Sequence, residues 1–353
     1  MRVAFVAIET THQSDSRGNR RFERIARKLA EDGHEVTVFC GQWWDDYTDE
    51  TVVDGLRYRG VTLGTALTSF VARLPALLAT YRPDVIHVRP IPPQQVLAAL
   101  TGGKLARTPV VVEWFGDELT ADDRFVRQVV NRPQRLITPS ELVRTEVREL
   151  GADGDLTRVI PESIDFSRVE SVDPADEVDV VYGHPLDGTA NLDDLLLGLA
   201  EMRTRDWRAT IVGDGPLREE YEREVQKLRI DDRVSFVGDC DRDTRLSIYR
   251  GAHVFVQTAH REQFASELLW ALACGCIGIV EYQAESSAHE LIENYERSYR
   301  VTSPQQLAQA IVDAAEFDHL TIDETWRSYD HEHVLDHYVE EYEALQADAG
   351  LLG

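Results

Sequence analysis

The sequence predicts two α/β domains, each a doubly wound parallel sheet covered by helices, that face a cleft between them. The chain has 353 residues, which is more than a single hydrophobic core usually fills. In both halves, short runs rich in Val and Ile alternate with longer runs of helical periodicity. This alternation is typical of parallel sheets with helical crossovers. Between 165 and 177 the periodicity fades into acidic residues and Pro174, which indicates a linker.

The first half predicts a regular succession of strands and helices. Residues 3–8 form a β-branched run that we interpret as a buried strand. Residues 20–32 follow as an amphipathic helix, which Gly33 ends. The other expected elements of this half are strands at 35–40, 84–88, 109–112 and 136–138 and a helix at 140–150.

The second half repeats this logic. A strand is expected at 178–182 and a helix at 191–202. The further expected elements are strands at 209–212, 234–237, 254–257 and 277–280 and a helix at 217–228. In doubly wound domains ligands bind outside the carboxyl ends of the strands. We therefore expect the ligand site where the carboxyl edges of the two sheets meet the cleft.

The charge of the chain excludes some partners. The formal net charge is -26, and the acidic residues are spread evenly along the chain. Nucleic acid is not an expected partner, because phosphate binding needs clustered Lys and Arg, and strong docking on anionic lipid is disfavoured for the same reason. Lys28, Lys104 and Lys227 are the only lysines. Scarce lysine with abundant acid favours a halophilic organism over an ordinary acidic cytosolic protein.

The cysteines and the apolar runs indicate an intracellular protein. Four cysteines in a chain of this length form no disulfide framework, and Cys274 and Cys276 are expected to be small core residues. The apolar run at the N-terminus is too short for a signal peptide, and no stretch approaches the ~20 apolar residues that span a bilayer. The expected location is the cytoplasm, either free or at the inner face of the cell membrane.

Two segments of the second half carry a resemblance to a known family. They are IVGDGPLREEYEREVQKLRIDDRVSFVG (211–238) and YRGAHVFVQTAHREQFASELLWALACGCIGIV (249–280). With them the chain resembles the GT-B glycosyltransferases, specifically the retaining family four (group 1). Weaker matches to the same family are FERIARKLAEDGHEVTVF (22–39), RPDVIHVR (82–89), RVIPESIDFSRV (158–169) and TWRSYDHEHVLDHYVEEYEAL (325–345).

The resemblance implies an architecture and an activity. Residues 1–168 would form a Rossmann-like acceptor-binding domain, 177–324 a Rossmann-like domain for the nucleotide-sugar donor, and 325–353 a helix that crosses back. The implied reaction moves a sugar from a nucleotide sugar to a glycan, lipid-linked or other acceptor with retention, without metal or cofactor. By analogy the pathway would be haloarchaeal cell-surface glycan biosynthesis, with peripheral membrane contact through the acceptor.

The start of the helix after Glu262 is the expected place for the donor phosphate. Unpaired N–H groups and the helix dipole both favour an anion there. The residues in question are Phe264, Ala265 and Ser266. In the resembling family a Glu at the position of Glu262 contacts the transferred sugar.

A second family Glu, eight residues later, holds the ribose, but here that position is Trp270. Glu267 lies three residues before Trp270 and so on the same face of the helix. Our hypothesis is that Glu267 takes the ribose contact while Trp270 stacks on or walls the site. The alternative is that Trp270 packs in the core and Glu267 is solvated. Gly213 and Gly238, in the first matching segment, are expected to line the ribose and base.

The family's phosphate-binding cations are also replaced. His184 stands at the position of an Arg, and Thr189 or Ala190 at that of a Lys, which should weaken stabilisation of the leaving group. Arg261 could supply the charge instead, as could Arg20 or Arg21. The alternative for each of these arginines is a plain surface role.

In the first domain the family has a His where this chain has Phe115. Glu113 and Asp117 are nearby carboxylates, and one of them could contact the acceptor hydroxyl as a base; the alternative is plain loop acids. Gly18 and Asn19 stand where the family has a Gly-Gly turn, and a Gly there lets the backbone approach the donor phosphate.

Other readings stay open. Two Asp-x-Asp matches, at 153–155 and 239–241, are expected by chance in a chain with 63 acidic residues, so no metal is expected. The replacements at Trp270, His184 and Phe115 motivate a second hypothesis: a catalytically degenerate GT-B protein that binds a nucleotide or a protein partner. A minor third hypothesis is a sugar-nucleotide epimerase of the same fold.

Overall fold

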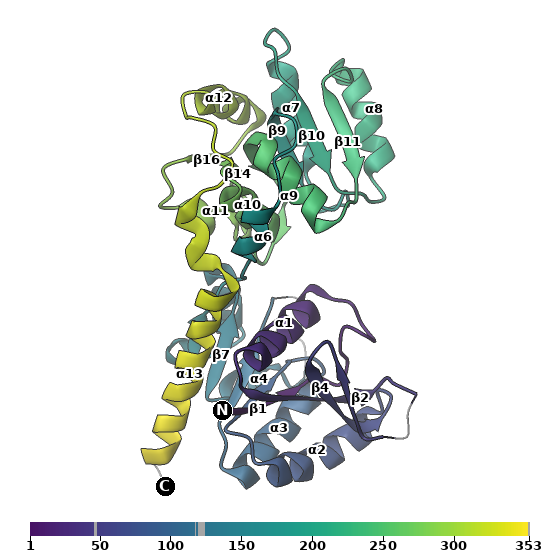
Figure 1. Ribbon diagram of the computed structural model, residues 1–353, viewed down its shortest axis with the longest axis vertical. Coiled ribbons are helices and arrows are strands. Elements are labelled where there is room, and N and C mark those ends of the chain that lie inside the picture. Colours follow the sequence, from purple (N-terminus) through teal and green to yellow (C-terminus); the bar gives the residue numbers. More distant parts are fainter. Residues whose placement is uncertain (46–47, 117, 119–123, 352–353) are drawn as a thin grey trace. The chain divides into compact units, whose positions relative to one another are not determined.

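The computed structural model describes residues 1–45, 48–116, 118 and 124–351 (Figure 1). Its contacts divide the chain into two compact units. Unit 1 comprises Met1–Glu162 and Glu332–Gly353, and unit 2 comprises Ser163–His331. The chain therefore leaves unit 1 once and returns to it at its C-terminus.

The sheet of unit 1 has the strand order β3-β4-β2-β1-β5-β6-β7-β8. Its strands are β1 (Arg2–Val6), β2 (Glu35–Gln42), β3 (Glu50–Val53), β4 (Leu56–Leu63), β5 (Val85–Val88), β6 (Val110–Glu113), β7 (Arg135–Thr138) and β8 (Thr157–Val159). Neighbouring strands pair in parallel except β3, which forms an antiparallel hairpin with β4. The hairpin was not predicted, although Asp54 and Gly55 at its turn both have positive φ and Asp-Gly is a strong hairpin signal.

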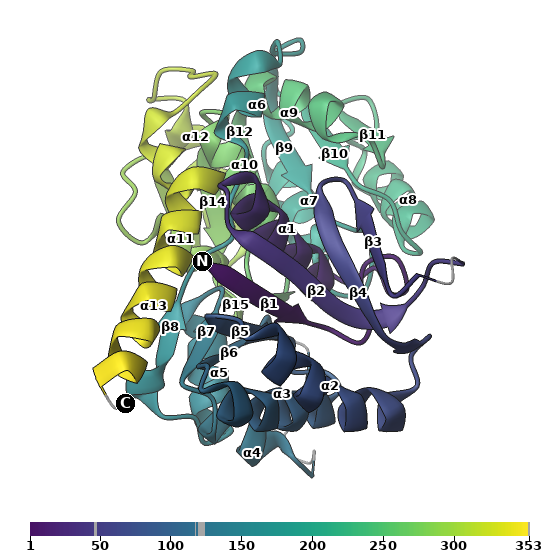
Figure 2. The same ribbon diagram turned by 60° about the horizontal axis from the view of Figure 1, so that its bottom comes forward.

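Helices cover the sheet of unit 1. They are α1 (Arg17–Glu31), α2 (Leu67–Tyr81), α3 (Pro93–Ala106), α4 (Val126–Asn131), α5 (Glu141–Glu149), α13 (His331–Leu351) and a 3-10 turn at Gly154–Leu156. Helix α1 begins earlier than predicted because the Ser16 side chain accepts a hydrogen bond from the Asn19 N–H and caps it. Helices α2 and α3 lie side by side (Figure 2). Helix α13 buries Tyr338 and Tyr342 in the same apolar cluster as Phe22 of α1.

The sheet of unit 2 has the strand order β11-β10-β9-β12-β14-β16, and all its pairs are parallel. Its strands are β9 (Val178–Gly183), β10 (Ala209–Val212), β11 (Val234–Gly238), β12 (Ala252–Gln257), β14 (Ile277–Glu281) and β16 (Ser298–Val301), and β13 (Arg261–Glu262) pairs separately with β15 (Glu285–Ser286). The chain winds to one side of β9 through β10 and to the other through β12. Doubly wound sheets bind ligands at such a switch point, outside the carboxyl ends of the strands.

The two faces of this sheet bury separate cores. Val181 packs in one apolar cluster and its neighbour Tyr182 in the other, because successive side chains of a strand point to opposite faces. The covering helices are α6 (Phe166–Ser171), α7 (Leu192–Glu201), α8 (Arg218–Leu228), α9 (Arg242–Gly251), α10 (Ser266–Ala273), α11 (Ala288–Ile292), α12 (Pro304–Ala314) and a 3-10 helix at Glu324–Tyr329.

The linker predicted at 165–177 is partly wrong. Its first half forms α6, whose Phe166 and Val169 are fully buried. Asp165 caps the helix by accepting a hydrogen bond from the Arg168 N–H. The acidic residues that suggested a linker therefore include a helix cap.

Candidate functional site

A buried His–Glu pair lies at the carboxyl edge of the unit 2 sheet. His184 follows the last residue of β9, and Glu262 ends the short strand β13. His184 Nε2 lies 2.9 Å from Glu262 Oε1, and both side chains are almost completely buried. A charged or polar pair in such a place is costly to bury unless its members satisfy one another. The structure thus brings together two residues that the sequence analysis assigned to the same donor site.

The hydrogen bonds around His184 define where its protons lie. Its Nδ1 is 2.7 Å from the main-chain oxygen of Pro185, and a carbonyl oxygen only accepts hydrogen bonds. Nδ1 therefore carries a proton and donates it to Pro185. The opposite ring nitrogen, Nε2, faces the Glu262 carboxylate.

Main-chain contacts hold Glu262 in place. The Ser287 N–H donates to the Glu262 carbonyl oxygen at 2.8 Å, and the Ser287 hydroxyl donates to the carbonyl oxygen of Gln263 at 2.9 Å. On the other side, the His260 N–H donates to the Thr189 carbonyl oxygen at 2.9 Å. The loop is thereby tied to two neighbouring segments, which orients the Glu262 side chain without help from a ligand.

Helix α10 begins directly after this loop. Its N-cap residue is Ala265, and no side chain caps the helix. Phe264 and Ala265 are buried, whereas Ser266 is the first helical residue. The amides of the first turn are the groups that bind an anion at a helix N-terminus.

Glu267 and Trp270 do not lie as the ribose hypothesis expects. The Glu267 carboxylate is 3.0 Å from both Arg242 Nη1 and Arg245 Nη1 and accepts a 2.7 Å hydrogen bond from the Tyr249 hydroxyl. Burial raises the pKa of Glu267, but the two arginines and the tyrosine outweigh it, so the net pKa is lowered and the carboxylate stays ionised. These partners already use the carboxylate that was expected to hold a ribose.

Trp270 packs in the apolar cluster beneath the sheet and is 9% exposed. The Arg242 guanidinium lies over its ring at 5.0 Å from the centroid, a cation–π contact. Arg242 thus bridges Trp270 and Glu267, which confirms the same-face geometry and favours a structural role for both residues. Sequence reasoning missed Arg242 and Arg245, because both come from α9, a different element from α10.

Gly213 and Gly238 shape the turns beside the His–Glu pair. The Gly213 N–H donates to the Gly238 carbonyl oxygen at 2.9 Å, and both glycines have positive φ. A Cβ on Gly213 would lie 2.1 Å from the His184 carbonyl oxygen. Gly213 is therefore required for the close approach of the turn that carries His184.

The arginines considered as replacement cations differ in their surroundings. Arg261 is exposed, and no ion pair links it to a carboxylate within the described residues. Arg20 pairs with Asp15 on the surface of unit 1. Arg21 is buried in unit 1 and donates to Glu113, the Ile160 carbonyl oxygen and the Tyr338 hydroxyl, so the suggestion that it meets the donor phosphate is not supported.

Glu113 is enclosed in the same network. Its carboxylate is 2.5 Å from Arg21 Nε and 3.0 Å from His87 Nε2, and it accepts from the Tyr338 hydroxyl at 3.1 Å. Burial raises the pKa of Glu113, but Arg21 and His87 lower it to about 2. A fully buried carboxylate with this pKa and these partners is a poor general base; it fastens α13 to unit 1 instead. The alternative candidate, Asp117, lies outside the described residues.

The structure of unit 1 explains why residue 18 is a glycine. It lies in the first turn of α1, and a Cβ there would come within 2.4 Å of the Arg89 guanidinium. Arg89 Nη1 also forms an ion pair with Glu118 Oε1 at 2.7 Å. Asn19 Nδ2 donates to the Ser14 carbonyl oxygen at 2.9 Å. Both residues thus order the turn where a phosphate contact was predicted.

Two further polar residues at the unit 2 edge were missed. Glu281 ends β14 and accepts a 3.2 Å hydrogen bond from Asn191 Nδ2; burial, aided by Asp194, raises its pKa to about 7. Gln257 ends β12, is 2% exposed, and its Oε1 has no hydrogen-bond partner among the described residues. Their position at strand ends beside the switch point was the signal that could have found them.

The described part of the chain shows neither a metal cluster nor a membrane span. No group of three or more His, Cys, Asp or Glu side chains there is placed to hold a metal ion. None of the helices described combines the length and the apolarity that crossing a bilayer requires. Cys274 and Cys276 are buried in the core of unit 2 as expected.

Comparison with known families divides the chain where the structure does. Residues 18–162 match the glycosyl transferase 4-like domain, and residues 163–320 match the glycosyl transferases group 1. A curated relative, the 2-deoxystreptamine N-acetyl-D-glucosaminyltransferase of Streptomyces fradiae, is 25% identical over a 301-residue comparison, and the match covers 71% of this chain and 71% of the relative.

Solved structures share the fold. HepE of Anabaena, in complex with UDP, matches with a TM-score of 0.74 and 16% identity over 98% of this chain and 100% of its own. A glycosyltransferase of Rickettsia africae matches with a TM-score of 0.77 and 15% identity over 97% of this chain and 98% of its own. The predicted fold class, two α/β domains with parallel Rossmann-like sheets, is confirmed.

Proposed function

Because the chain belongs to the group 1 glycosyltransferases of GT-B fold, which act with nucleotide-sugar donors, we propose that it transfers a sugar with retention and without a metal ion. The proposed acceptor is a glycan or a lipid-linked saccharide. The acceptor and the membrane-face location rest on the sequence resemblance, whereas the halophilic origin and the cytoplasmic location rest on composition and apolar runs; all of them stay predictions.

The observation that carries the proposal is the buried His184–Glu262 pair beside the start of α10. Breaking a sugar–diphosphate bond puts negative charge on the leaving phosphate, and fixed donors aimed at that charge are the largest catalytic contribution in many enzymes. The amides of the α10 first turn would hold the phosphate. Glu262, oriented by His184 and by the Ser287 N–H, would accept hydrogen bonds from the hydroxyls of the transferred sugar.

Positive charge for the diphosphate would come from Arg261. It directly precedes Glu262 and is exposed, and no carboxylate of the described residues pairs with it. Arg242 and Arg245 are less suited, since Glu267 already balances them. Ribose binding by Glu267 would require it to release one of these arginines.

A second candidate function is nucleotide or partner binding without transfer. The engagement of Glu267 by Arg242 and Arg245 and the packing of Trp270 favour it, because neither replaces the missing ribose carboxylate in this state. The two functions differ in whether a bound donor is consumed.

Nucleotide binding is the first experiment. UDP, GDP, dTDP and ADP would be titrated into the protein by calorimetry at low and at molar KCl, with EDTA present, and the matching nucleotide sugar would follow. Slow hydrolysis of that donor would be monitored by NMR, which also reports the anomeric configuration of the released sugar. Glu262→Gln is the test variant. Glu285→Gln is its matched control, because Glu285 is an exposed carboxylate on the paired strand β15.

The outcomes separate the candidates. For a transferase, Glu262→Gln should leave the affinity for the nucleoside diphosphate unchanged and slow donor consumption by ~10²-fold or more, whereas Glu285→Gln should change neither. Arg261→Gln should weaken diphosphate binding itself. Binding without any consumption would support the second candidate. Absence of binding to all four nucleotides would refute the transferase and leave only partner binding from the second candidate. Loss of turnover in EDTA would refute metal independence.

A further inference from the structure

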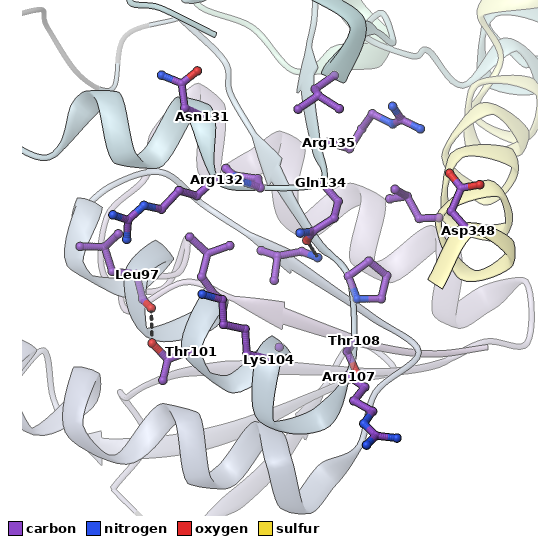
Figure 3. A pocket seen from close by; sticks show the side chains of 17 residues that line it. Leu97, Thr101, Lys104, Arg107, Thr108, Asn131, Arg132, Gln134, Arg135 and Asp348 are labelled. Carbon is purple, nitrogen blue, oxygen red and sulfur yellow. Dashed lines mark hydrogen bonds between the residues drawn. The ribbon is translucent and has the colours of Figure 1, made fainter. Parts of the chain in front are cut away.

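Unit 1 contains a pocket of about 800 Å³ that lies away from the carboxyl edge of its sheet. Pro109 and Val110 line it at the start of β6, and Arg135 lines it at the start of β7. These strands are parallel, so the pocket lies at their amino ends (Figure 3). Ligands of doubly wound domains bind at the opposite edge. The pocket is therefore separate from any donor or acceptor site expected at the carboxyl edge.

The charge of the pocket is opposite to that of the chain. Acidic residues outnumber basic ones by 63 to 37 in the sequence. The pocket is lined by four basic residues and a single acidic one, Asp348. The basic residues are Lys104, Arg107, Arg132 and Arg135. Lys104 is one of only three lysines in the chain. An anion would thus find here a local positive field that the rest of the composition does not offer.

Two of these cations are available to a ligand. Arg135 is balanced by Glu341 at 2.7 Å, and Arg107 points away from the centre of the pocket in Figure 3. Lys104 and Arg132 are exposed and turn their charged ends to the same side of the pocket. Within the described residues neither forms an ion pair. Like charges that converge without an acid repel one another, and a bound anion would relieve that repulsion.

The position of Lys104 and Arg132 at helix ends explains only part of this arrangement. Lys104 is in the last turn of α3, and Arg132 directly follows α4, where cations offset the helix dipole. Arg82 and Arg229 stand at the corresponding ends of α2 and α8, but neither lines this pocket. The dipole therefore accounts for a cation at each helix end but not for their convergence on one cavity.

The remaining walls are mostly apolar, with Thr101, Thr108, Asn131 and Gln134 as uncharged polar residues. The apolar residues include Leu97, Leu100, Pro109, Pro133, Leu156 and Leu345. The volume falls in the range of small-molecule sites, which combine apolar walls with a few placed polar groups. We propose that the pocket binds one molecule of an anionic amphiphile, with its phosphate or carboxylate at Lys104 and Arg132 and its apolar body against the leucines. This site is independent of the proposed transfer reaction.

Octyl phosphate below its micelle concentration is the probe. Calorimetry on the full chain should show saturable binding of one molecule. Butyl phosphate should bind at least about tenfold more weakly, because each buried methylene contributes about fourfold to affinity. Octanol, which has the tail without the charge, should also bind at least about tenfold more weakly.

Variants separate the pocket from general surface charge. Lys104→Gln/Arg132→Gln should weaken the binding of octyl phosphate at least about tenfold, whereas the control Arg82→Gln/Arg229→Gln, which removes two exposed helix-end cations elsewhere, should not. Thr101→Trp would fill the pocket from its exposed rim while keeping both cations, and should remove the difference between octyl and butyl phosphate. Thermal melts would show that each variant folds.

Competition with vesicles that contain phosphatidic acid distinguishes the two possible sources of the amphiphile. Vesicles that compete with octyl phosphate indicate a lipid of a bilayer, and vesicles that do not compete indicate a free metabolite; both support the site. The proposal is overturned if octyl phosphate does not saturate, if the two double variants lose affinity equally, or if binding is independent of tail length. Binding to vesicles alone would also overturn it, since that would reflect a charged surface and not a pocket.

Discussion

Substitution of Glu113 by Gln tests the network that fastens the last helix to unit 1. The carboxylate is fully buried between Arg21, His87 and Tyr338. The amide keeps the shape of the side chain but removes its charge. Among the described residues, the Arg21 guanidinium would then retain only Glu162, at 3.5 Å, as an anionic partner. An incompletely paired buried cation is the expected defect.

The size of the effect follows from the pKa of Glu113. Its partners, working against burial, lower that pKa from an ordinary 4.5 to about 2. At about 1.36 kcal/mol for each pKa unit, this corresponds to about 3 kcal/mol of stability, which agrees with the ~3–5 kcal/mol measured when one member of a buried pair is removed. Because the folded-state pKa is the lower one, this stability is present above pH 4.5 and is lost as the pH falls through about 2.

Hydrogen exchange followed by mass spectrometry is a suitable assay, because it reports each unit separately. At pH 7, Glu113→Gln should lower the opening free energy of α13 and of the unit 1 strands by about 3 kcal/mol, while peptides of unit 2 serve as an internal reference. Tyr342→Phe, which removes only the hydrogen bond to His87 Nδ1, should cost about 1 kcal/mol. A change below about 1 kcal/mol in unit 1, or an equal change in both units, would refute the reasoning.

Two further predictions concern unit 2. Burial raises the pKa of Glu281 to about 7, so ionisation of Glu281 opposes folding, and the stability of unit 2 should fall as the pH rises from about 4.5 through 7. Glu281→Gln should therefore stabilise unit 2 by about 2–3 kcal/mol at pH 8 and leave its stability unchanged at pH 4. Urea unfolding that shows the same gain at both pH values would contradict this. Gly213→Ala should destabilise unit 2 by more than about 2 kcal/mol and weaken nucleotide binding, because the added Cβ would collide with the His184 carbonyl oxygen. Gly188→Ala is the control and should have neither effect, because a Cβ at Gly188 meets no atom within 4 Å.

Much of the candidate donor site could be proposed from the sequence because it is local. Glu262 and the start of α10 are neighbours in the chain, and the turns at Gly213 and Gly238 are fixed by a residue type that tolerates positive φ. The sequence analysis placed His184 and Glu262 in the same predicted site but did not predict that their side chains pair. Their 2.9 Å contact depends on β9 lying next to β12, which strand-level patterns do not specify.

The fate of the other carboxylates depended on distant partners. Glu113 meets Tyr338, 225 residues later in the chain, and Glu267 meets arginines from α9. Neither pairing can be predicted from the neighbouring residues in the sequence, so a buried structural carboxylate cannot be told apart there from a carboxylate of a ligand site. The cationic pocket is a similar case, since Lys104 and Arg132 belong to α3 and to the end of α4, which come together only in the fold.

The sequence by itself determined the two α/β domains, the order of most of their elements and the place of the motif that we propose binds the donor, since strand and helix periodicities and turn residues act over a few neighbouring positions. Only the tertiary structure decided which carboxylates are buried and neutralised, what Trp270 packs against, and where positive charge gathers in an acidic chain. Those outcomes depend on side chains brought together from distant segments, and burial and charge pairing there outweigh local preference.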